Sequence, residues 1–278
     1  MKLIKEICNE PQVKCDNCEL RRAARALVFN DKNEIALMNV TKHNYYKLPG
    51  GGIEHGEDIQ TALAREIKEE VGATIHVVGE LGMIIETRSY AKFRGSNGEA
   101  CPLCQISYCY IAKVISLGEN CLDEEETSDG FTVEWHPLDK AIQLLKDSEP
   151  RGSEYIDYSG KYIVERDLAF LNEYKKAHPK IITICGSLRF QDQQMITAER
   201  LELEGNAVIS CIYPPPNFDK DSYIKEQGDM LDKMHKAKID ISDAIFVVNV
   251  GGYVGTSTKS EIEYAKKTGK EVMWLEPS

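Results

Sequence analysis

Apolar residues recur in two different patterns along the chain, and the change of pattern divides it into two parts. Up to about residue 175, short apolar runs alternate with polar positions and turn residues, which predicts strands, hairpins and flanking helices. From Ile181 onward, continuous β-branched runs alternate with amphipathic segments, which predicts a parallel, doubly wound sheet. The polar, proline-bearing stretch 175–180 separates them. We therefore expect an α/β chain with one domain at residues 1–176 and a second, smaller Rossmann-like domain at 177–278.

The same pattern locates the individual elements. In the first part we expect a hairpin turn at residues 30–33, a helix after residue 58, strands near 82–88 and 106–114, and helices from Pro137 and Tyr162. In the second part we expect strands at 181–185, 207–213, 244–250 and 271–275, with helices ending at Gly205 and covering 223–240 and 257–268. In such a sheet, ligands bind outside the carboxyl ends of the strands.

The stretch from Gly51 to Ala73 reads GGIEHGEDIQTALAREIKEEVGA and joins a glycine turn to an amphipathic helix. Apolar residues recur there every fourth position and would pack on a sheet. Glu66, Glu69 and Glu70 have the spacing that brings side chains together on one helix face. Adjacent carboxylates repel one another unless a cation joins them, and all-oxygen sites favour Mg²⁺ first and Mn²⁺ second. Gly72 is expected to end the helix.

This stretch resembles the Nudix box, G-x5-E-x7-R-E-U-x-E-E-x-G-U with U aliphatic, at every fixed position; Ala73 stands where a larger aliphatic residue is usual. The matched residues are Gly51, Glu57, Arg65, Glu66, Glu69, Glu70 and Gly72. The resemblance implies an α/β/α sandwich that hydrolyses a nucleoside diphosphate linked to a group X. Its three box glutamates would hold Mg²⁺, and Arg65 would orient Glu57. A solvated acidic helix face is the alternative interpretation.

Hydrolysis also requires a general base, which in this family is a box glutamate or an acid from a distant loop. The acidic segment LDEEETSDG offers Glu124, Glu125, Glu126 and Asp129 as candidates. Each of them is equally well interpreted as part of a solvated loop. Variable loops select the group X and the nucleobase of the substrate. The substrate therefore stays open between a triphosphate, ADP-ribose and another dinucleotide.

Glycine and hydroxyl residues follow the expected strands of the second part. Gly186 and Ser187 follow the first strand, and Gly255 and Ser257 lead into the last helix. Backbone amides at such helix starts suit a phosphate.

This half resembles the nucleoside 2-deoxyribosyltransferase superfamily, including its nucleoside-monophosphate N-glycosidase branch. The resemblance rests on Cys185-Gly186-Ser187, on Ser242-Asp243-Ala244, and on Glu261-Ile262-Glu263-Tyr264-Ala265. It implies that Glu261 attacks or stabilises the anomeric carbon. It also implies that Gly186, Ser187, Asp243, Gly255 and Ser257 contribute to ligand binding.

One departure from that family concerns activation of the base. The family often has an aspartate eight positions before the one matching Asp243, whereas this chain has His235, which we interpret as an ordinary surface-helix residue. Two hypotheses remain. Either the chain is a bifunctional hydrolase that releases a nucleoside monophosphate and then splits it into base and sugar phosphate, or its second domain is a nucleotide-sensing or dimerisation module. Members of the superfamily often complete their site from a neighbouring subunit, which implies a homodimer.

The nine cysteines include two CxxC pairs, Cys15 with Cys18 and Cys101 with Cys104. Two such pairs suit one zinc ion. Because the pairs are far apart in the sequence and lack the glycine or basic turn residues of zinc knuckles, we interpret them instead as reduced cysteines. The absence of a disulfide framework indicates a reducing, cytoplasmic environment.

The formal net charge is −11, and the chain has no basic cluster. This argues against a nucleic-acid polymer as partner, because phosphate contacts need Lys and Arg. A small nucleotide neutralised by Mg²⁺ stays compatible with it. No apolar run has the length of a membrane span, so we expect neither insertion nor export.

Overall fold

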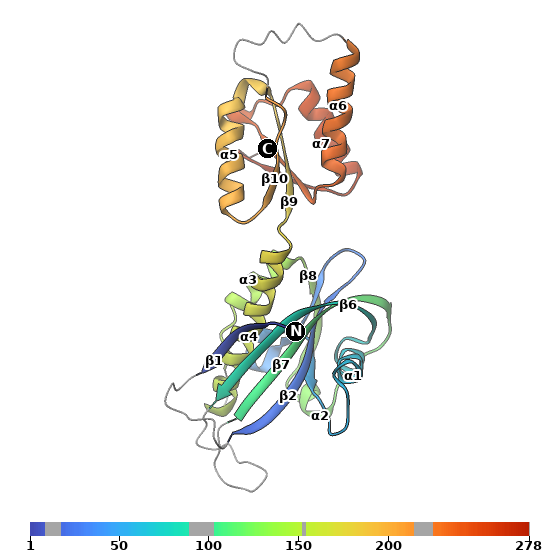
Figure 1. Cartoon of the computed structure of the whole chain (residues 1–278), viewed down its shortest axis with the longest axis vertical. Helices are drawn as coiled ribbons and strands as arrows, with labels where there is room; N and C mark the ends of the chain where they lie inside the picture. The colour runs from blue at the N-terminus through green and yellow to red at the C-terminus, as the bar shows by residue number, and fades with distance from the viewer. Residues whose placement is uncertain (9–17, 89–102, 152–153, 214–224, 278) are drawn as a thin grey trace. The chain divides into compact units, whose positions relative to one another are not determined.

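The protein is described by a computed structural model, in which the chain separates into two compact units, Met1–Lys175 (unit 1) and Lys176–Ser278 (unit 2) (Figure 1). The structure describes residues 1–8, 18–88, 103–151, 154–213 and 225–277. No helix among them is long and apolar enough to cross a lipid bilayer.

Unit 1 is built on one mixed sheet with helices on both faces. Its strand order is β1-β6-β7-β2-β3-β4, with β5 paired to β2 and β8 paired to β3. The elements are β1 (Leu3–Cys8), β2 (Glu19–Phe29), β3 (Ile35–Val40), β4 (Tyr45–Lys47), β5 (Gly50–Gly52), α1 (Ile59–Val71), β6 (Ala73–Arg88), β7 (Leu103–Leu117), α2 (Glu124–Ser128), β8 (Phe131–His136), α3 (Leu138–Lys146) and α4 (Glu154–Ala177).

Strand β2 shows how the sequence produces two cores. Successive side chains of a strand point to opposite faces of its sheet. Ala24, Ala26 and Val28 are buried in the core that includes α1. Leu27 and Phe29 are buried in the other core, which includes residues of α3 and α4. A strand buried on both faces reads as the continuous apolar run ALVF, and the result is the expected α/β/α sandwich.

Helix α1 begins and ends where its sequence predicts. Asp58 caps it by accepting hydrogen bonds from the backbone N–H groups of Gln60 and Thr61. Gly72 ends it in the left-handed conformation with φ 74°, which a side chain rarely adopts. Residues 50–52 pair antiparallel with β2 as the short strand β5, and the glycine turn before the helix lies at residues 55–56, where Gly56 has a φ of 83°.

Other boundaries also differ from the expected ones. Strand β6 begins at Ala73, directly after α1, because it pairs along its whole length with β7. Helix α4 begins at Glu154 instead of Tyr162.

Unit 2 is a four-stranded sheet whose paired strands are all parallel, in the order β10-β9-β11-β12. This confirms the expected separate parallel sheet. Its elements are β9 (Ile181–Gly186), α5 (Gln191–Leu203), β10 (Ala207–Ile209), α6 (Lys225–Asp240), β11 (Ala244–Val248), α7 (Thr256–Lys267) and β12 (Glu271–Trp274). The edge strand β10 is shorter than the apolar run 207–213 indicates.

The two faces of this sheet are covered by different helices (Figure 1). Ile182 and Ile184 pack in one core with Leu201 of α5. Cys185 and Ile262 belong to the opposite core, which is formed with α6 and α7.

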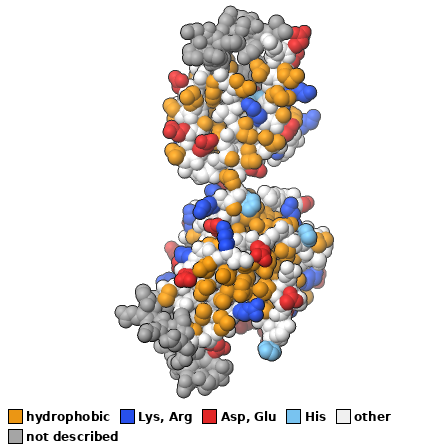
Figure 2. Space-filling view, in the orientation of Figure 1, with side chains coloured by type: hydrophobic (Ala, Val, Ile, Leu, Met, Phe, Trp, Pro, Cys, Tyr) orange, Lys and Arg blue, Asp and Glu red, His pale blue; other side chains and the backbone are white. Residues whose placement is uncertain are grey.

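The CxxC pairs lie only partly in the described residues. Cys15 and Cys101 lie outside them, while Cys18 precedes β2 and Cys104 lies in β7. On the face of the described chain shown in Figure 2, basic side chains are interspersed with acidic and apolar ones and form no continuous tract.

Candidate active site and a second pocket

The glycines of β5 let that strand lie directly against the acidic face of α1. A Cβ atom on Gly51 would overlap the carboxylate of Glu66. A Cβ atom on Gly50 would overlap the backbone carbonyl of Ala24, and Gly50 has a φ of 126°. The glycines are therefore required by close approach, and Gly51 forms part of the space in which the Glu66 carboxylate lies.

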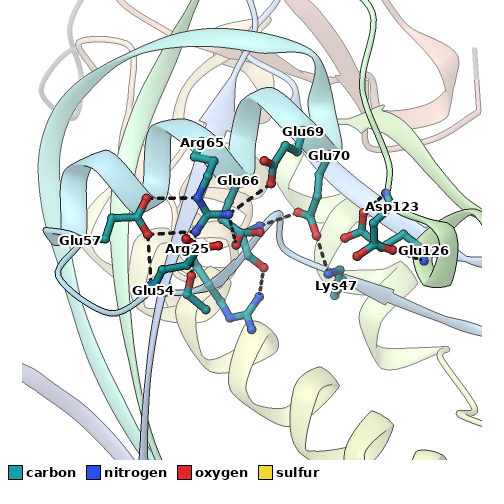
Figure 3. Close-up of polar contacts among 12 residues, drawn as sticks. Arg25, Lys47, Glu54, Glu57, Arg65, Glu66, Glu69, Glu70, Asp123 and Glu126 are labelled. Carbon is teal, nitrogen blue, oxygen red and sulfur yellow. Dashed lines mark hydrogen bonds and ion pairs between the residues drawn. The ribbon is translucent and has the colours of Figure 1, made fainter.

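Arg65 links the carboxylates of the box (Figure 3). Its guanidinium donates two hydrogen bonds to Glu57, at 3.1 and 3.0 Å, and one to the carbonyl of Gly52 at 3.0 Å. It also lies 2.8 Å from Glu66 Oε1 and 3.2 Å from Glu69 Oε2. Hydrogen bonds from Arg65 lower the pKa of Glu57, which keeps this carboxylate charged. Arg65 thus fixes the loop before α1 to the acidic face of the helix.

Glu70 is the buried member of the acidic group. It is 1% exposed, and its carboxylate accepts from Lys47 Nζ and from the backbone N–H of Gly50, each at 2.6 Å. Burial raises the pKa of Glu66; Arg65 opposes the rise, and the negative charge of Glu70 adds to it. The structure therefore brings Glu66, Glu69 and Glu70 to one region, with negative charge that its own cations only partly balance.

Among the four loop acids, Glu126 is the one that the structure brings into the electrostatic field of this region. Burial raises the pKa of Glu126, and the charge of Glu70 raises it further. Glu126 also accepts from the backbone N–H of Asp123 in a capping box. Glu124 and Glu125 are exposed on α2.

Asp129, the fourth loop acid, is engaged elsewhere. It pairs with Lys42 at 2.7 Å and lies 3.3 Å from the His43 ring, so it holds the loop to the segment before β4.

Charged residues that the sequence did not reveal hold β5 and the segment between β4 and β5 in place. Arg25 donates to the Gly50 carbonyl at 2.7 Å, and Asp167 accepts from the Leu48 N–H at 2.8 Å. Asp167 is itself held by Arg166 at 2.7 Å. Arg25 interrupts an otherwise apolar buried strand, and a charge in such a run is the signal that could have identified it. Lys47, next to the glycines, has a comparable role toward Glu70.

Unit 2 has a pocket with a volume of about 560 Å³ at the carboxyl ends of β9 and β11. The predicted residues Gly186, Ser187, Gly255, Ser257 and Glu261 line it.

Asp243 does not line this pocket. Its carboxylate accepts from the Ile181 N–H at 2.7 Å, at the amino ends of the strands and not at the carboxyl ends where the pocket lies. The prediction that Asp243 contributes to this pocket is therefore not supported by its position. The amides of Gly251 and Gly252 are occupied as well, because both donate to Glu276 at 3.1 Å.

His235 is buried, so its interpretation as a surface residue is wrong. The residue is 9% exposed, and its ring Nε2 lies 3.4 Å from Cys185 Sγ and 3.6 Å from Glu261 Oε1. Burial lowers the pKa of His235 to about 4 and raises the pKa of Glu261 to about 7. The imidazole is therefore neutral at pH 7, and its contact with Glu261 is not an ion pair there. Glu263, two positions further, is exposed.

Known proteins resemble about half of this chain in sequence. Diphosphoinositol polyphosphate phosphohydrolase 3-beta of Homo sapiens is 28% identical over 140 residues, which cover 49% of this chain and 76% of the relative. Diphosphoinositol polyphosphate phosphohydrolase 2 of Rattus norvegicus is 27% identical over 140 residues, covering 49% and 69%.

Solved structures include a NUDIX hydrolase from Nitrosomonas europaea, with 18% identity, a TM-score of 0.39 and coverage of 57% of this chain and 90% of that one. The MutT protein from Methanosarcina mazei Go1 has 21% identity, a TM-score of 0.34 and coverage of 57% and 98%.

The NUDIX domain model matches residues 19–158, which is half of the chain and contains the whole of β5 and α1. Through this domain the chain belongs to the Nudix family of hydrolases.

Proposed function

We propose that unit 1 hydrolyses the pyrophosphate bond of a nucleoside triphosphate, or of a nucleoside diphosphate linked to a group X, and releases a nucleoside monophosphate. The observation that carries this proposal is the acidic face of α1. There Glu66, Glu69 and Glu70 lie beside a glycine strand, and Arg65 and Lys47 balance only part of their charge.

Nudix hydrolases generally use Mg²⁺ or Mn²⁺, and the residues of this site fit such a cation. The donors are carboxylate oxygens, which hard divalent cations prefer. Gly51 leaves the space in which the Glu66 carboxylate lies, and the mutual repulsion of Glu66 and Glu70 favours a cation between them. We propose that Glu66, Glu69 and Glu70 hold Mg²⁺. When bound, the cation would neutralise charge on the phosphate oxygens and acidify water.

The remaining steps belong to side chains of unit 1. Arg65 keeps Glu57 and the glycine strand in place, and Lys47 orients Glu70. We propose that Glu126 accepts a proton from the attacking water. The water oxygen then bonds to one phosphorus while the bridging oxygen leaves with its electrons. A carboxylate with a raised pKa is a stronger base, which suits this role.

The substrate is the finer part of this proposal. Arg21 and Arg22 line a pocket of about 390 Å³ next to Gly52 and Ile53, and Arg21 is oriented by a 3.0 Å hydrogen bond to Gln105. Guanidinium groups beside the glycine strand suit phosphate groups. We propose that the phosphate groups of ADP-ribose or of another dinucleotide bind there. The names of the relatives add a diphosphoinositol polyphosphate to the substrates worth testing.

Product analysis tests the proposal. Purified chain with Mg²⁺ would be offered nucleoside triphosphates, ADP-ribose, dinucleotides and a diphosphoinositol polyphosphate in isotopically labelled water, and the products analysed by mass spectrometry. Labelled monophosphate or labelled leaving phosphate identifies the phosphorus attacked. Turnover of the inositol substrate alone would contradict the nucleotide assignment. Turnover unaffected by chelation and by Glu66→Gln would contradict the site.

A second activity is favoured by Glu261, which lies on the wall of the unit 2 pocket with its Oε2 atom buried and without a hydrogen-bond partner. We propose that residues 177–278 form an N-glycosidase. The Glu261 carboxylate would bond to the anomeric carbon while the bond to the base breaks, and water would then release the sugar phosphate. The N-terminus of α7, which has no side-chain cap, would receive the 5′-phosphate.

Base release from nucleoside monophosphates tests this activity. Glu261→Gln should abolish it, and Glu263→Gln on the exposed face of the same helix should leave it unchanged. Monophosphate that binds and alters the rate of unit 1 without losing its base would instead make unit 2 a sensing module. Light scattering with and without nucleotide would test whether the chain forms the proposed homodimer.

A further inference from the structure

Three side chains with metal-binding atoms converge inside unit 2. Cys185 comes from β9, His235 from α6 and Glu261 from α7, and one donor atom of each lies within 4.8 Å of the other two. Cys185 and His235 are buried, and the side chain of Glu261 is 15% exposed. His235 and Glu261 line the unit 2 pocket and Cys185 lies buried beside them, so the groups do not meet on an acidic surface.

The spacing of the donor atoms fits a tetrahedral ion. Around a tetrahedral zinc ion with bonds of about 2.0 to 2.3 Å, neighbouring ligand atoms lie roughly 3.3 to 3.8 Å apart. His235 Nε2 lies 3.4 Å from Cys185 Sγ and 3.6 Å from Glu261 Oε1. A thiol, an imidazole and a carboxylate together favour zinc over magnesium, which takes oxygen ligands.

The surroundings of His235 favour the tautomer that a metal needs. Its Nδ1 atom lies 3.9 Å from Cys211 Sγ, and the Cys211 thiol donates to the carbonyl of Ile184 at 3.6 Å. With its proton used in this way, Cys211 offers sulfur lone pairs to a proton on Nδ1. The lone pair of Nε2 then points toward Cys185 and Glu261, as in metal sites where a second partner orients the ring.

Glu261 supplies an independent observation. Its Oε2 atom is buried and has no hydrogen-bond partner. Buried polar atoms are normally paired, so an atom of this kind requires an explanation such as an ion. His235 and Glu261 both line the 560 Å³ pocket, which leaves the fourth position of a tetrahedral ion open to water or a ligand.

We propose that Cys185, His235 and Glu261 form a zinc site with one open position facing the unit 2 pocket. Binding releases the thiol proton of Cys185 to solvent and any proton held by Glu261, while His235 binds as the neutral imidazole. A bound ion occupies the Glu261 carboxylate, so zinc loading and glycosyl transfer at Glu261 are alternative states of one pocket.

The test uses the full chain after chelator treatment. Zinc would be titrated against a chromophoric indicator with Mg²⁺ present to occupy the unit 1 carboxylates. Cobalt would be titrated in parallel, because a thiolate ligand gives a sulfur-to-cobalt charge-transfer band. We expect one tight site. Cys185→Ser should remove the band, and Cys185→Ser, His235→Gln and Glu261→Gln should each weaken binding at least about 100-fold.

Controls separate this site from the CxxC pairs and from misfolding. Cys15→Ser with Cys101→Ser breaks both pairs, and Glu263→Gln changes an exposed carboxylate of α7, so both variants should bind zinc as the parent chain does. Cys185 is buried in a core, so the zinc affinity of Cys185→Ser is interpreted only if circular dichroism shows that this variant is folded. If Cys185→Ser is unfolded, Glu261→Gln supplies the decisive result, because it preserves the shape of the side chain. Undiminished zinc affinity in folded Glu261→Gln overturns the proposal.

Base release distinguishes this proposal from the glycosidase. If chelated chain releases base and zinc suppresses it, both are supported. If zinc binds at these residues but neither form releases base, the glycosidase fails and the metal site stands. If base is released and no zinc binds, the metal-site proposal is contradicted and the glycosidase proposal stands.

Discussion

The two sites hold their carboxylates in different electrostatic settings. In unit 1, Glu66 and Glu70 each contact a cation, Arg65 at 2.8 Å or Lys47 at 2.6 Å. In unit 2, Glu261 lies beside a thiol and a neutral imidazole, and burial raises its pKa to about 7. The carboxylates of unit 1 thus contact cationic side chains, whereas that of unit 2 contacts an uncharged thiol and a neutral imidazole and needs a proton or a cation to be neutralised. The first arrangement suits a permanent metal site, and the second suits a group that changes state.

The strongest test of this contrast removes one charge from unit 1. We expect Glu66→Gln to lower kcat/KM for pyrophosphate hydrolysis at least about 10³-fold, or about 4 kcal/mol, because a donor to the cation is lost. Release of nucleoside monophosphate at saturating Mg²⁺ measures it. Glu119→Gln, at an exposed position, is the control. Base release by unit 2 should be the same in both variants, and a loss below about tenfold would show that Glu66 is not a ligand.

The pH profile of hydrolysis tests whether Glu126 acts as the general base close to the charge of Glu70. Burial and the charge of Glu70 raise its pKa, and a base acts only when deprotonated. Hydrolysis should therefore increase as the pH rises through that raised pKa. We expect Glu126→Gln to lower kcat about 10²- to 10³-fold and to remove this acidic limb. Glu125→Gln, on the exposed side of α2, should keep both the rate and the limb. An unchanged limb in Glu126→Gln would assign the base to another residue.

The close approach of β5 to α1 predicts a smaller effect on the activity of unit 1. Gly51→Ala should displace the Glu66 carboxylate and lower kcat about 10²-fold, since small misplacements of catalytic groups have effects of this size. The displaced group is the end of a flexible side chain, so the melting temperature should change little. Gly79→Ala in β6, where a Cβ meets nothing within 4 Å, is the matched control. Equal activity in the two variants would exclude the close approach as a requirement.

The contrast between the sites also explains what the sequence could predict. The carboxylates of unit 1 lie within one helix, so their spacing alone places them on one face. Arg65 and Glu57 are eight positions apart, and their contact follows from the same turn and helix. The alternation of parallel strands and helices likewise predicted the sheet of unit 2.

The cluster of unit 2 was not predictable in this way. Cys185, His235 and Glu261 are separated by 50 and 26 positions and come from three elements. Helix α6 reads as a polar surface helix, and only packing against β9 shows that His235 faces inward. Asp243 is a different case. It directly precedes the expected strand 244–250, so the sequence already placed it at the amino end of that strand, and the family resemblance alone assigned it to a site at the carboxyl ends.

The smallest predicted effect is on the unfolding free energy and concerns Gly186, which we compare with Gly51. A Cβ atom on Gly186 would lie 3.1 Å from the Val248 carbonyl oxygen and 3.2 Å from Gln194 Nε2. The backbone of β11 cannot move as a side-chain end can, so we expect Gly186→Ala to lower the unfolding free energy of unit 2 by about 1 to 2 kcal/mol.

Denaturant unfolding in a Trp135→Phe background measures this, because it leaves Trp274 in β12 as the fluorescent reporter of unit 2. Gly228→Ala in α6, where a Cβ meets nothing within 4 Å, should raise stability by about 0.5 to 1 kcal/mol instead. Loss of stability at Gly186 with none at Gly51 would show that the glycine of unit 1 serves the placement of a carboxylate and that of unit 2 serves packing. Equal losses at both positions would contradict this distinction, because the backbone of β5 would then be as tightly confined as that of β9.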